Sequence, residues 1–300
     1  MKMRLLSASL LLQNAFILSG LAATAEEWRS RSIYQLVTDR FALADGSSPA
    51  CNSSARQYCG GSWQGVINKL DYIQGMGFDA VWISPVVQNI EDQTAYGQAY
   101  HGYWTADINA LNSHFGSSDD LKSLSDALHK RGMFLMLDVV VNHFAAATQP
   151  QSVNYSALQP FGVQQDFHPF CFISDYNNQT DVEQCWLGDN NVPLPDVDTE
   201  DQAVVDTMNN WIKGLVSNYS ADGLRIDTVK HIRKDFWPGF ASNSSVFTLG
   251  EVLINDTNYA APYTRTYIIL FACYVLLIAF LEVIDSVLDY PTYFALASAL

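Results

Sequence analysis

One stretch of the sequence, 134–141, is apolar at every position except Asp138. A strand without a polar face has to be covered on both sides, as strands of parallel sheets are. Four other short segments have strand character, at 32–38, 80–84, 223–227 and 246–249. Helical patterns at 66–73, 119–131 and 199–218 lie between the first four strands. Strands that alternate with helices predict an α/β fold with a parallel sheet.

Polar side chains gather where these strands end. They are Asn142, His143, Asp227, Lys230, His231 and Glu251. In α/β barrels the functional site lies at the carboxyl ends of the strands. These residues therefore define the expected site.

Arg225 and Asp227 share one face of a strand, because alternate residues point the same way. A guanidinium at close range favours the ionised carboxylate, so Asp227 is expected to stay charged. Glu251 follows the apolar run 246–249, and desolvation there is expected to raise its pKa. An ionised Asp and a protonated Glu roughly 5 Å apart form the nucleophile and acid of a retaining glycosidase. The alternatives are a structural ion pair for Arg225 with Asp227, and a solvated loop carboxylate for Glu251.

The net charge of −15 argues against a nucleic-acid or anionic-membrane partner, since both require a basic surface. At the N-terminus, Lys2 and Arg4 precede an apolar run to Leu21 and the small-residue exit 23–25. This pattern predicts a secretory signal peptide over 1–25 and an extracellular mature chain. A retained membrane anchor is the alternative.

Secretion changes what the cysteines predict, because exported thiols usually form disulfides. We expect the pairs Cys51 with Cys59 and Cys171 with Cys185, although spacing alone does not determine connectivity. The second pair would staple an aperiodic excursion of some fifty residues after His143, which is long enough to form a small subdomain. Among six Asn-x-Ser/Thr acceptor sites, the glycosylation candidates are Asn154, Asn178 and Asn218.

Three segments in order, 138–143, 223–231 and 250–252, resemble the first three signature segments of the family-thirteen glycoside hydrolases. The stretches 74–78, 99–104, 185–190 and 235–239 resemble the secreted fungal α-amylases of that family. The resemblance covers residues 28–263 and resumes over 283–296. It implies an incomplete (β/α)8 TIM barrel, with about five of eight strands and a small irregular subdomain inserted after strand 3.

The resemblance also implies roles for particular residues. Asp227 would be the nucleophile, Glu251 the acid/base and Arg225 the residue that orients the nucleophile. The residues that would bind the sugars are Tyr103, Trp104, His143, Lys230 and His231. A calcium ion would be held by side-chain oxygens of Asn142, Glu183 and Asp196 and by the backbone carbonyl of His231, since oxygen ligands suit this hard cation.

The chain departs from the family in two ways. The family's third catalytic Asp, after strand seven, has no counterpart before Leu300, and the last three barrel strands are expected to be absent. The second departure is 264–282, with the apolar run 268–281. It is interpreted as a transmembrane helix, a buried helix or, as we favour, translated intron sequence that brings in the unpaired Cys273. The run is shorter than the roughly 20 residues that a membrane span needs.

The expected organisation has six parts. They are the signal peptide 1–25, the barrel in two pieces, 26–142 and 198–263, the calcium-binding subdomain 143–197, the apolar insert 264–282 and a truncated barrel remnant, 283–300.

The expected function is that of a secreted, monomeric α-amylase, a retaining endo-hydrolase of α-1,4-glucosidic bonds in starch, with little or no activity in the chain as it stands. One alternative is a cell-wall 4-α-glucanotransferase of the same family, whose fungal members tend to depart at the position of His143. Another is a non-catalytic glucan-binding fragment. No nucleic-acid partner is expected, and a membrane only if the run 268–281 inserts.

Overall fold

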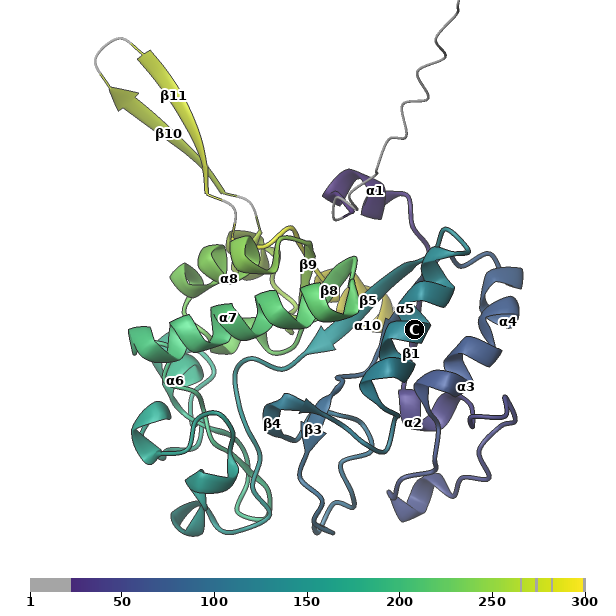
Figure 1. Cartoon of the computed structure of the whole chain (residues 1–300). Helices are drawn as coiled ribbons and strands as arrows, with labels where there is room; N and C mark the ends of the chain where they lie inside the picture. Colours follow the sequence, from purple (N-terminus) through teal and green to yellow (C-terminus); the bar gives the residue numbers. More distant parts are fainter. Residues whose placement is uncertain (1–22, 265, 273–274, 282, 299–300) are drawn as a thin grey trace, which may run out of the picture.

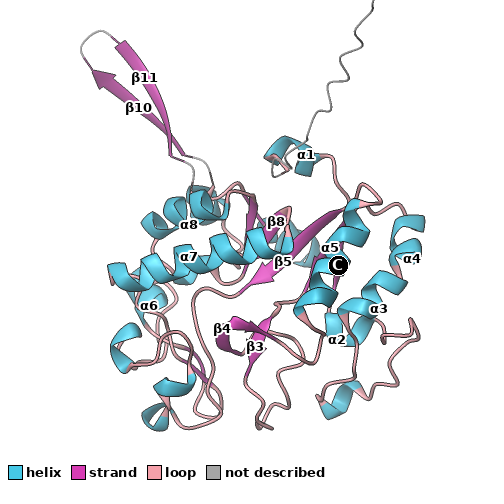
Figure 2. Cartoon of the chain, in the orientation of Figure 1, coloured by secondary structure: helices cyan, strands magenta, loops and turns pink. Residues whose placement is uncertain are grey.

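The computed structural model describes residues 23–264, 266–272, 275–281 and 283–298. Its centre is a parallel sheet of six strands in the order β1-β2-β5-β8-β9-β12 (Figures 1 and 2). The strands are β1 (Ile33–Leu36), β2 (Ala80–Ile83), β5 (Phe134–Val139), β8 (Gly223–Ile226), β9 (Phe247–Gly250) and β12 (Ser286–Val287). Helices between consecutive strands make this the parallel half of a barrel, which confirms the predicted fold class.

The sheet has one strand more than the sequence predicts. β12 pairs with β9, with Ser286 opposite Leu249 and Val287 opposite Gly250. The expectation that the last three barrel strands are absent is therefore wrong for the sixth strand. A strand of two residues is too short to show any hydrophobic period, which explains why the pattern does not reveal it.

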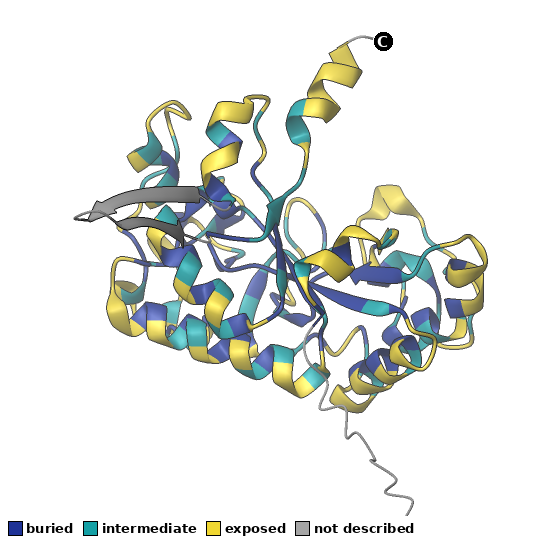
Figure 3. Cartoon of the chain, turned by 90° about the horizontal axis from the view of Figure 1, so that it is seen from above, coloured by how far each residue is buried: buried dark blue, intermediate teal, exposed yellow. Residues whose placement is uncertain are grey.

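Helices cover the outer face of the sheet (Figures 1 and 3). They are α3 (Trp63–Asn68), α4 (Leu70–Gly75), α5 (Ser118–His129), α7 (Gln202–Tyr219) and α8 (Trp237–Ser244). α5 begins at a capping box in which Ser117 and Asp120 satisfy each other's backbone N–H groups. The predicted helix 66–73 is observed as two short helices that meet at Lys69. The apolar stripes of these helices join the outer strand faces in one large core.

Trp28 closes the N-terminal end of the sheet. It lies on α1 (Ala25–Arg29) and packs against the first residues of two strands, with ring centroids 5.2 Å from Phe134 and 5.3 Å from Phe247. Its indole N–H donates to the carbonyl of Asp222 at 3.0 Å. A Cβ on Gly223 would lie 2.8 Å from the indole ring, so glycine is required at this approach. Because Trp28 covers the N-terminal end of the sheet, a functional site is expected at the C-terminal end.

The excursion 143–197 folds over that C-terminal end. It contains three 3-10 turns, α6 (Gln179–Gln184) and the short strands β6 (Leu187–Gly188) and β7 (Pro193–Leu194). Both predicted disulfides are confirmed, Cys51 with Cys59 and Cys171 with Cys185. The second one staples the excursion, as expected.

The remaining elements are connections and caps around the same edge. They are α2 (Thr38–Phe41), β3 (Val87–Asn89), β4 (Thr105–Leu111), the 3-10 turns η5 (Val229–His231) and η6 (Lys234–Phe236), α9 (Thr257–Ala260), η7 (Ala261–Tyr263) and α10 (Tyr290–Ser298). α10 extends from the body of the molecule with most of its side chains exposed (Figure 3).

The apolar insert is a β-hairpin and not a helix. β10 (Thr266–Ala272) pairs antiparallel with β11 (Val275–Leu281) and projects from the body (Figure 1). Both helical interpretations of 264–282 are therefore wrong. A continuous apolar run has no period that distinguishes a strand from a helix, so the sequence pattern does not decide between them. Among the described residues, no helix has the length and apolar character to cross a bilayer. The intron hypothesis stays a prediction, and Cys273 and most of the signal-peptide segment, 1–22, lie outside the described residues.

Candidate active site

A cavity of about 490 Å³ opens at the C-terminal ends of β5, β8 and β9. Its lining includes six of the residues that the sequence predicts for the site: Tyr103, Trp104, His143, Arg225, Asp227 and Glu251. Thr228 and three residues of the β6/β7 hairpin, Leu187, Gly188 and Leu194, complete it. The cavity thus combines two aromatic side chains with a group of buried charges.

Arg225 is the electrostatic centre of the cavity. Its Nη1 donates to Asp138 Oδ1 at 2.9 Å and to Asp227 Oδ1 at 2.8 Å, and its Nη2 lies 2.9 Å from Glu251 Oε2. The three carboxylates come from three neighbouring strands or strand ends, and the parallel register brings them together. They outweigh the effect of burial and raise the pKa of the guanidinium. Arg225 is therefore a permanent cation in this site.

Asp138 is the functional residue that the sequence reasoning missed. It is fully buried and accepts hydrogen bonds from Arg225, from the Tyr103 hydroxyl at 2.7 Å and from the Trp82 indole at 2.9 Å. One carboxylate thus positions both the arginine and an aromatic side chain of the cavity. The sequence does contain a sign of this role. Asp138 is the single charged residue in an apolar strand, and a buried charge needs partners.

The structure reverses the predicted pKa shifts of the catalytic pair. Burial raises the pKa of Asp227 to about 8, since Arg225 compensates only part of the cost and Glu251 lies against it. Burial also raises the pKa of Glu251, but Arg225 and the Thr228 N–H, 3.0 Å from Oε2, together lower it below its usual value. The pKa of Asp227 is thus shifted upward and that of Glu251 downward, which is opposite to the directions that the sequence predicts.

The opposite pKa shifts of the two carboxyls follow from the positions of the hydrogen-bond donors around them. Glu251 reaches back to Arg225 and also accepts from the Tyr290 hydroxyl at 3.2 Å. Because one guanidinium attracts both carboxyls, Asp227 and Glu251 lie close enough to interact. Their predicted separation of roughly 5 Å stays a prediction.

The predicted sugar-binding histidines are buried and neutral. Burial lowers the pKa of His143 and of His231 to about 4. His143 Nε2 donates to the Tyr103 carbonyl at 3.3 Å, which directs this ring towards the cavity edge. His231 Nδ1 donates to the Val182 carbonyl at 3.1 Å, on α6.

Lys230 lies beside His231 on η5, and both are outside the cavity lining as the described residues define it. Lys230 Nζ donates to the Leu253 carbonyl at 2.8 Å, and burial lowers its pKa.

The four predicted calcium ligands are distributed over two adjoining groups. Asn142 Nδ2 donates to Asp196 Oδ2 at 2.9 Å, and both residues are buried. Glu183 Oε1 accepts from the Gln179 amide at 2.6 Å, and the same amide donates to the backbone of η5 next to His231.

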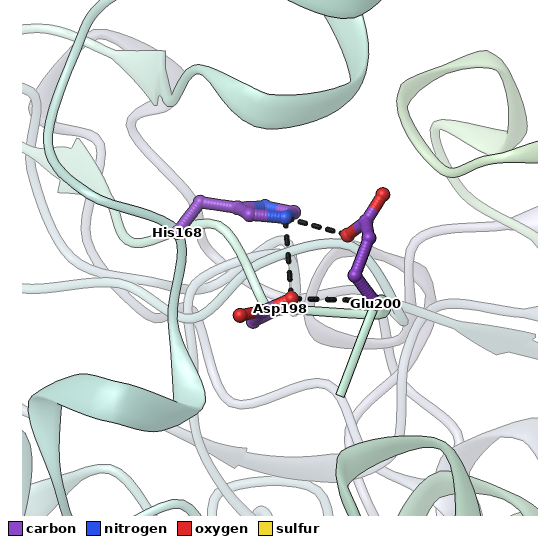
Figure 4. A group of neighbouring side chains, drawn as sticks. All are labelled: His168, Asp198 and Glu200. Atoms are coloured by element: carbon purple, nitrogen blue, oxygen red, sulfur yellow. Dashed lines mark hydrogen bonds and ion pairs between the residues drawn. The ribbon is translucent and has the colours of Figure 1, made fainter. Parts of the chain in front are cut away.

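An acidic group surrounds His168 (Figure 4), and it shares Asp196 with the predicted calcium ligands. Its ring lies 2.8 Å from Asp196, 2.6 Å from Glu200 and 3.4 Å from Asp198. Burial lowers the pKa of His168, but hydrogen bonds to Asp196 and Glu200 raise it to about 10. In its protonated form His168 would compensate part of the charge of these carboxylates.

The three glycosylation candidates are exposed. Asn154 lies before a 3-10 turn, Asn178 caps α6, and Asn218 is on α7. Exposure permits attachment of a glycan at each position, while occupancy stays a prediction.

A parallel barrel sheet that holds carboxylates around one arginine at its C-terminal edge places this chain among the barrel-type glycoside hydrolases. The family model of the alpha-amylase catalytic domain matches residues 35–268. Alpha-amylase 2 of Schwanniomyces occidentalis is 58% identical over 243 residues, and alpha-amylase 1 of Lipomyces kononenkoae is 53% identical over 277 residues. The chain belongs to the alpha-amylase family, as the sequence motifs predict.

The solved structure of an alpha-amylase from Malbranchea cinnamomea superposes with a TM-score of 0.83 at 48% identity and covers 91% of this chain. The alignments with the two yeast enzymes cover 81% and 92% of this chain. The chain spans 48% and 42% of the lengths of those relatives and 55% of the solved chain.

Proposed function

We propose that this protein is a secreted α-amylase, a retaining endo-hydrolase of internal α-1,4-glucosidic bonds in starch and related glucans. The observation that carries the proposal is the pair of hydrogen-bonded carboxyls, Asp227 and Glu251, at the wall of an aromatic-lined cavity. The identity to fungal alpha-amylases supports the same substrate class.

The proposed reaction begins with a proton transfer inside the carboxyl pair. Asp227 has to lose its proton before its carboxylate can attack the anomeric carbon, and Glu251 has to gain one before it can protonate the leaving oxygen. The hydrogen bond between them lets a single proton make both changes. Attack by Asp227 forms a glycosyl ester, and the Glu251 carboxylate then takes a proton from the water that hydrolyses it. Two inversions at the anomeric carbon give net retention.

The other cavity residues would bind and orient the sugar. Tyr103 and Trp104 offer flat faces on which a glucose ring can stack. Arg225 holds Asp227 in place through its Nη1 hydrogen bond, and neutral His143 can hydrogen-bond a sugar hydroxyl without adding charge. Lys230 and His231 on η5 would contact neighbouring sugars.

Glu251→Gln tests the acid role. We expect hydrolysis of maltooligosaccharides by the full chain to fall about 10²–10⁴-fold, the usual contribution of general acid catalysis. Release of fluoride from α-maltosyl fluoride should fall much less, because that leaving group needs no proton. Both rates are measured beside Glu91→Gln, an exposed carboxylate outside the cavity.

Equal losses on both substrates would contradict the acid role, and release of neither product by the wild-type chain would favour the alternative of a non-catalytic glucan-binding fragment. Proton NMR of the first products should show the α anomer. Longer oligosaccharides among the products would instead indicate a glucanotransferase.

We also propose that Asn142, Glu183, Asp196 and the carbonyl of His231 bind calcium. Asn142 Oδ1 is buried and has no hydrogen-bond partner within the described part of the chain, so an acceptor oxygen is available there. Burial raises the pKa of Asp196 to about 7 despite its hydrogen bond with His168, so a bound cation would favour the ionised form of this carboxylate. These oxygen donors fit a hard cation, and when bound the ion would supply charge compensation and hold the excursion to the barrel.

Removal of the metal should lower stability without changing the fold. We expect a chelator to lower the Tm by roughly 5–10 °C, as loss of a ligand present well above its Kd would for a chain of this size. Asn142→Leu should remove the response of the Tm to added calcium and the binding heat in calorimetry. Asn191→Leu, on the exposed β6/β7 turn, serves as the control. A calcium response that survives Asn142→Leu would contradict this ligand set.

Extracellular location is part of the same proposal. Two disulfides and exposed glycosylation motifs support an exported chain. A monomeric state stays a prediction from the sequence.

A further inference from the structure

Gln179, the first residue of α6, connects three segments through one side-chain amide. Its Nε2 lies 2.6 Å from Glu183 Oε1, 3.1 Å from the Lys230 carbonyl oxygen and 3.3 Å from the Tyr263 hydroxyl. Its Oε1 accepts from the Tyr259 hydroxyl at 2.5 Å. The partners belong to α6 itself, to η5, and to the α9/η7 segment that follows the strand end carrying the proposed acid.

The chemistry of these partners determines the orientation of the amide. A carboxylate and a backbone carbonyl can only accept, so Nε2 must face Glu183 and Lys230. The Tyr259 hydroxyl can donate, so Oε1 must face the tyrosine. Gln179 is only partly exposed, and its tyrosine partner Tyr263 is fully buried. A side chain that lacks either a donor or an acceptor would leave one of these groups without its partner.

η5 lies between α6 and Glu251. On one side, the carbonyl of Lys230 accepts from Gln179 and the ring of His231 donates to α6. On the other side, Val229 N–H donates to the backbone carbonyl of Glu251 at 2.9 Å. A displacement of η5 from α6 would therefore move the sugar-binding loop, while the ion pair with Arg225 keeps the Glu251 carboxyl in place.

We propose that Gln179 is a positioning residue that holds η5 against the inserted subdomain through direct hydrogen bonds. This link uses side-chain and backbone groups of the chain itself, so it acts in addition to any metal held by Glu183. Its effect on sugar binding rests on the proposed function, because Lys230 and His231 would contact the sugars beside the cleaved bond.

The chain contains a matched control. Gln202 is the first residue of α7, and its Nε2 donates to Asp206 four residues on, at 2.8 Å, as Gln179 does to Glu183. Gln202 is exposed and lies on the outer surface. Gln179→Met and Gln202→Met thus remove the same local hydrogen bond, but only the first removes contacts with η5 and with Tyr259.

Hydrogen–deuterium exchange followed by mass spectrometry measures the proposed link without any need for activity. In Gln179→Met, exchange in peptides over 226–236 should become about tenfold faster, as loss of one or two buried hydrogen bonds predicts. Gln202→Met should leave those peptides unchanged. Unchanged exchange at 226–236 in Gln179→Met, or equal changes in both variants, would overturn the proposal whether or not the chain hydrolyses glucans.

Kinetics separates positioning from general destabilisation. Gln179→Met should raise KM for maltooligosaccharides about fivefold to tenfold, with kcat nearly unchanged, because the loop that contacts neighbouring sugars moves while the carboxyl pair stays in place. Tyr259→Phe, which removes the hydroxyl that donates to Gln179 Oε1 but keeps the amide's bond to η5, should give a smaller KM increase in a chain that stays folded. A loss confined to kcat in both variants would contradict the inference.

Discussion

Asp227→Asn is expected to abolish glucan hydrolysis and, at the same time, to stabilise the folded chain at alkaline pH. Loss of a nucleophile that acts as a unit with its acid lowers kcat by on the order of 10⁴-fold or more. Asn keeps an oxygen that can accept from Arg225, so the buried guanidinium retains a partner. An activated, fluorinated glucosyl fluoride should label the wild-type peptide that contains Asp227 and leave the variant unlabelled.

The stability gain follows from the raised pKa of Asp227. The carboxyl has an ordinary value of 3.8 and a folded value of about 8. Protonation therefore favours the folded state, and this contribution is present below the ordinary value and is lost as the pH rises to about 8. Asn cannot ionise, so the variant should gain free energy of unfolding over the wild type across that interval, by on the order of several kcal/mol.

Urea denaturation at a series of pH values measures the difference. Asp119→Asn, on the exposed surface of α5, should change neither activity nor the pH profile. A variant with equal or lower stability than the wild type at pH 9 would show that folding does not raise the pKa of Asp227.

Asp138→Ala is expected to cost the folded state about 3–5 kcal/mol, because it breaks a buried ion pair and leaves Arg225 with only Asp227 and Glu251 as carboxylate partners. The same change removes the acceptor of the Tyr103 hydroxyl and of the Trp82 indole, both of which point into the barrel. Chemical denaturation gives the loss in free energy of unfolding. Asp92→Ala, in an exposed loop, is the control and should lie within about 0.5 kcal/mol of the wild type.

Asp138→Asn separates the charge from the shape of this side chain. Its amide can still accept one hydrogen bond, but its NH₂ group would face the Arg225 guanidinium or another donor. We expect an intermediate loss of stability and a lower intensity of near-UV signals from the aromatic side chains around the cavity. Equal stability of the Asn variant and the wild type would show that Asp138 acts as a packing residue and not as the anchor of Arg225.

Several features of this protein could be read from local sequence. The apolar run 134–141 indicates a strand that is buried on both faces, and the alternation of strands with helices predicts a parallel sheet. The short loops between Cys51 and Cys59 and between Cys171 and Cys185 brought each pair within reach. Because parallel strands end at one edge, the polar residues after β5, β8 and β9 had to be neighbours, and six of the expected site residues line one cavity.

Other features depend on contacts between segments that are distant in the chain. The pKa shifts of the carboxyl pair depend on how one guanidinium reaches Asp138, Asp227 and Glu251, and this follows from the register of three strands. Sequence spacing placed Arg225 beside Asp227 but said nothing of its bond to Glu251.

The run 268–281 shows the same limit for secondary structure. Its apolar residues show neither a helix period nor a strand period. The hairpin forms because the two halves of the segment pair with each other.

Local sequence thus determined which segments form strands and which strand ends carry polar side chains, because these depend on periods and stops. The tertiary structure alone decided in which direction the pKa of each carboxyl shifts, that Asp138 anchors the site and that Gln179 joins α6 to η5. Burial and the distances between charges control the energies of such groups, and neither quantity exists until the chain is folded.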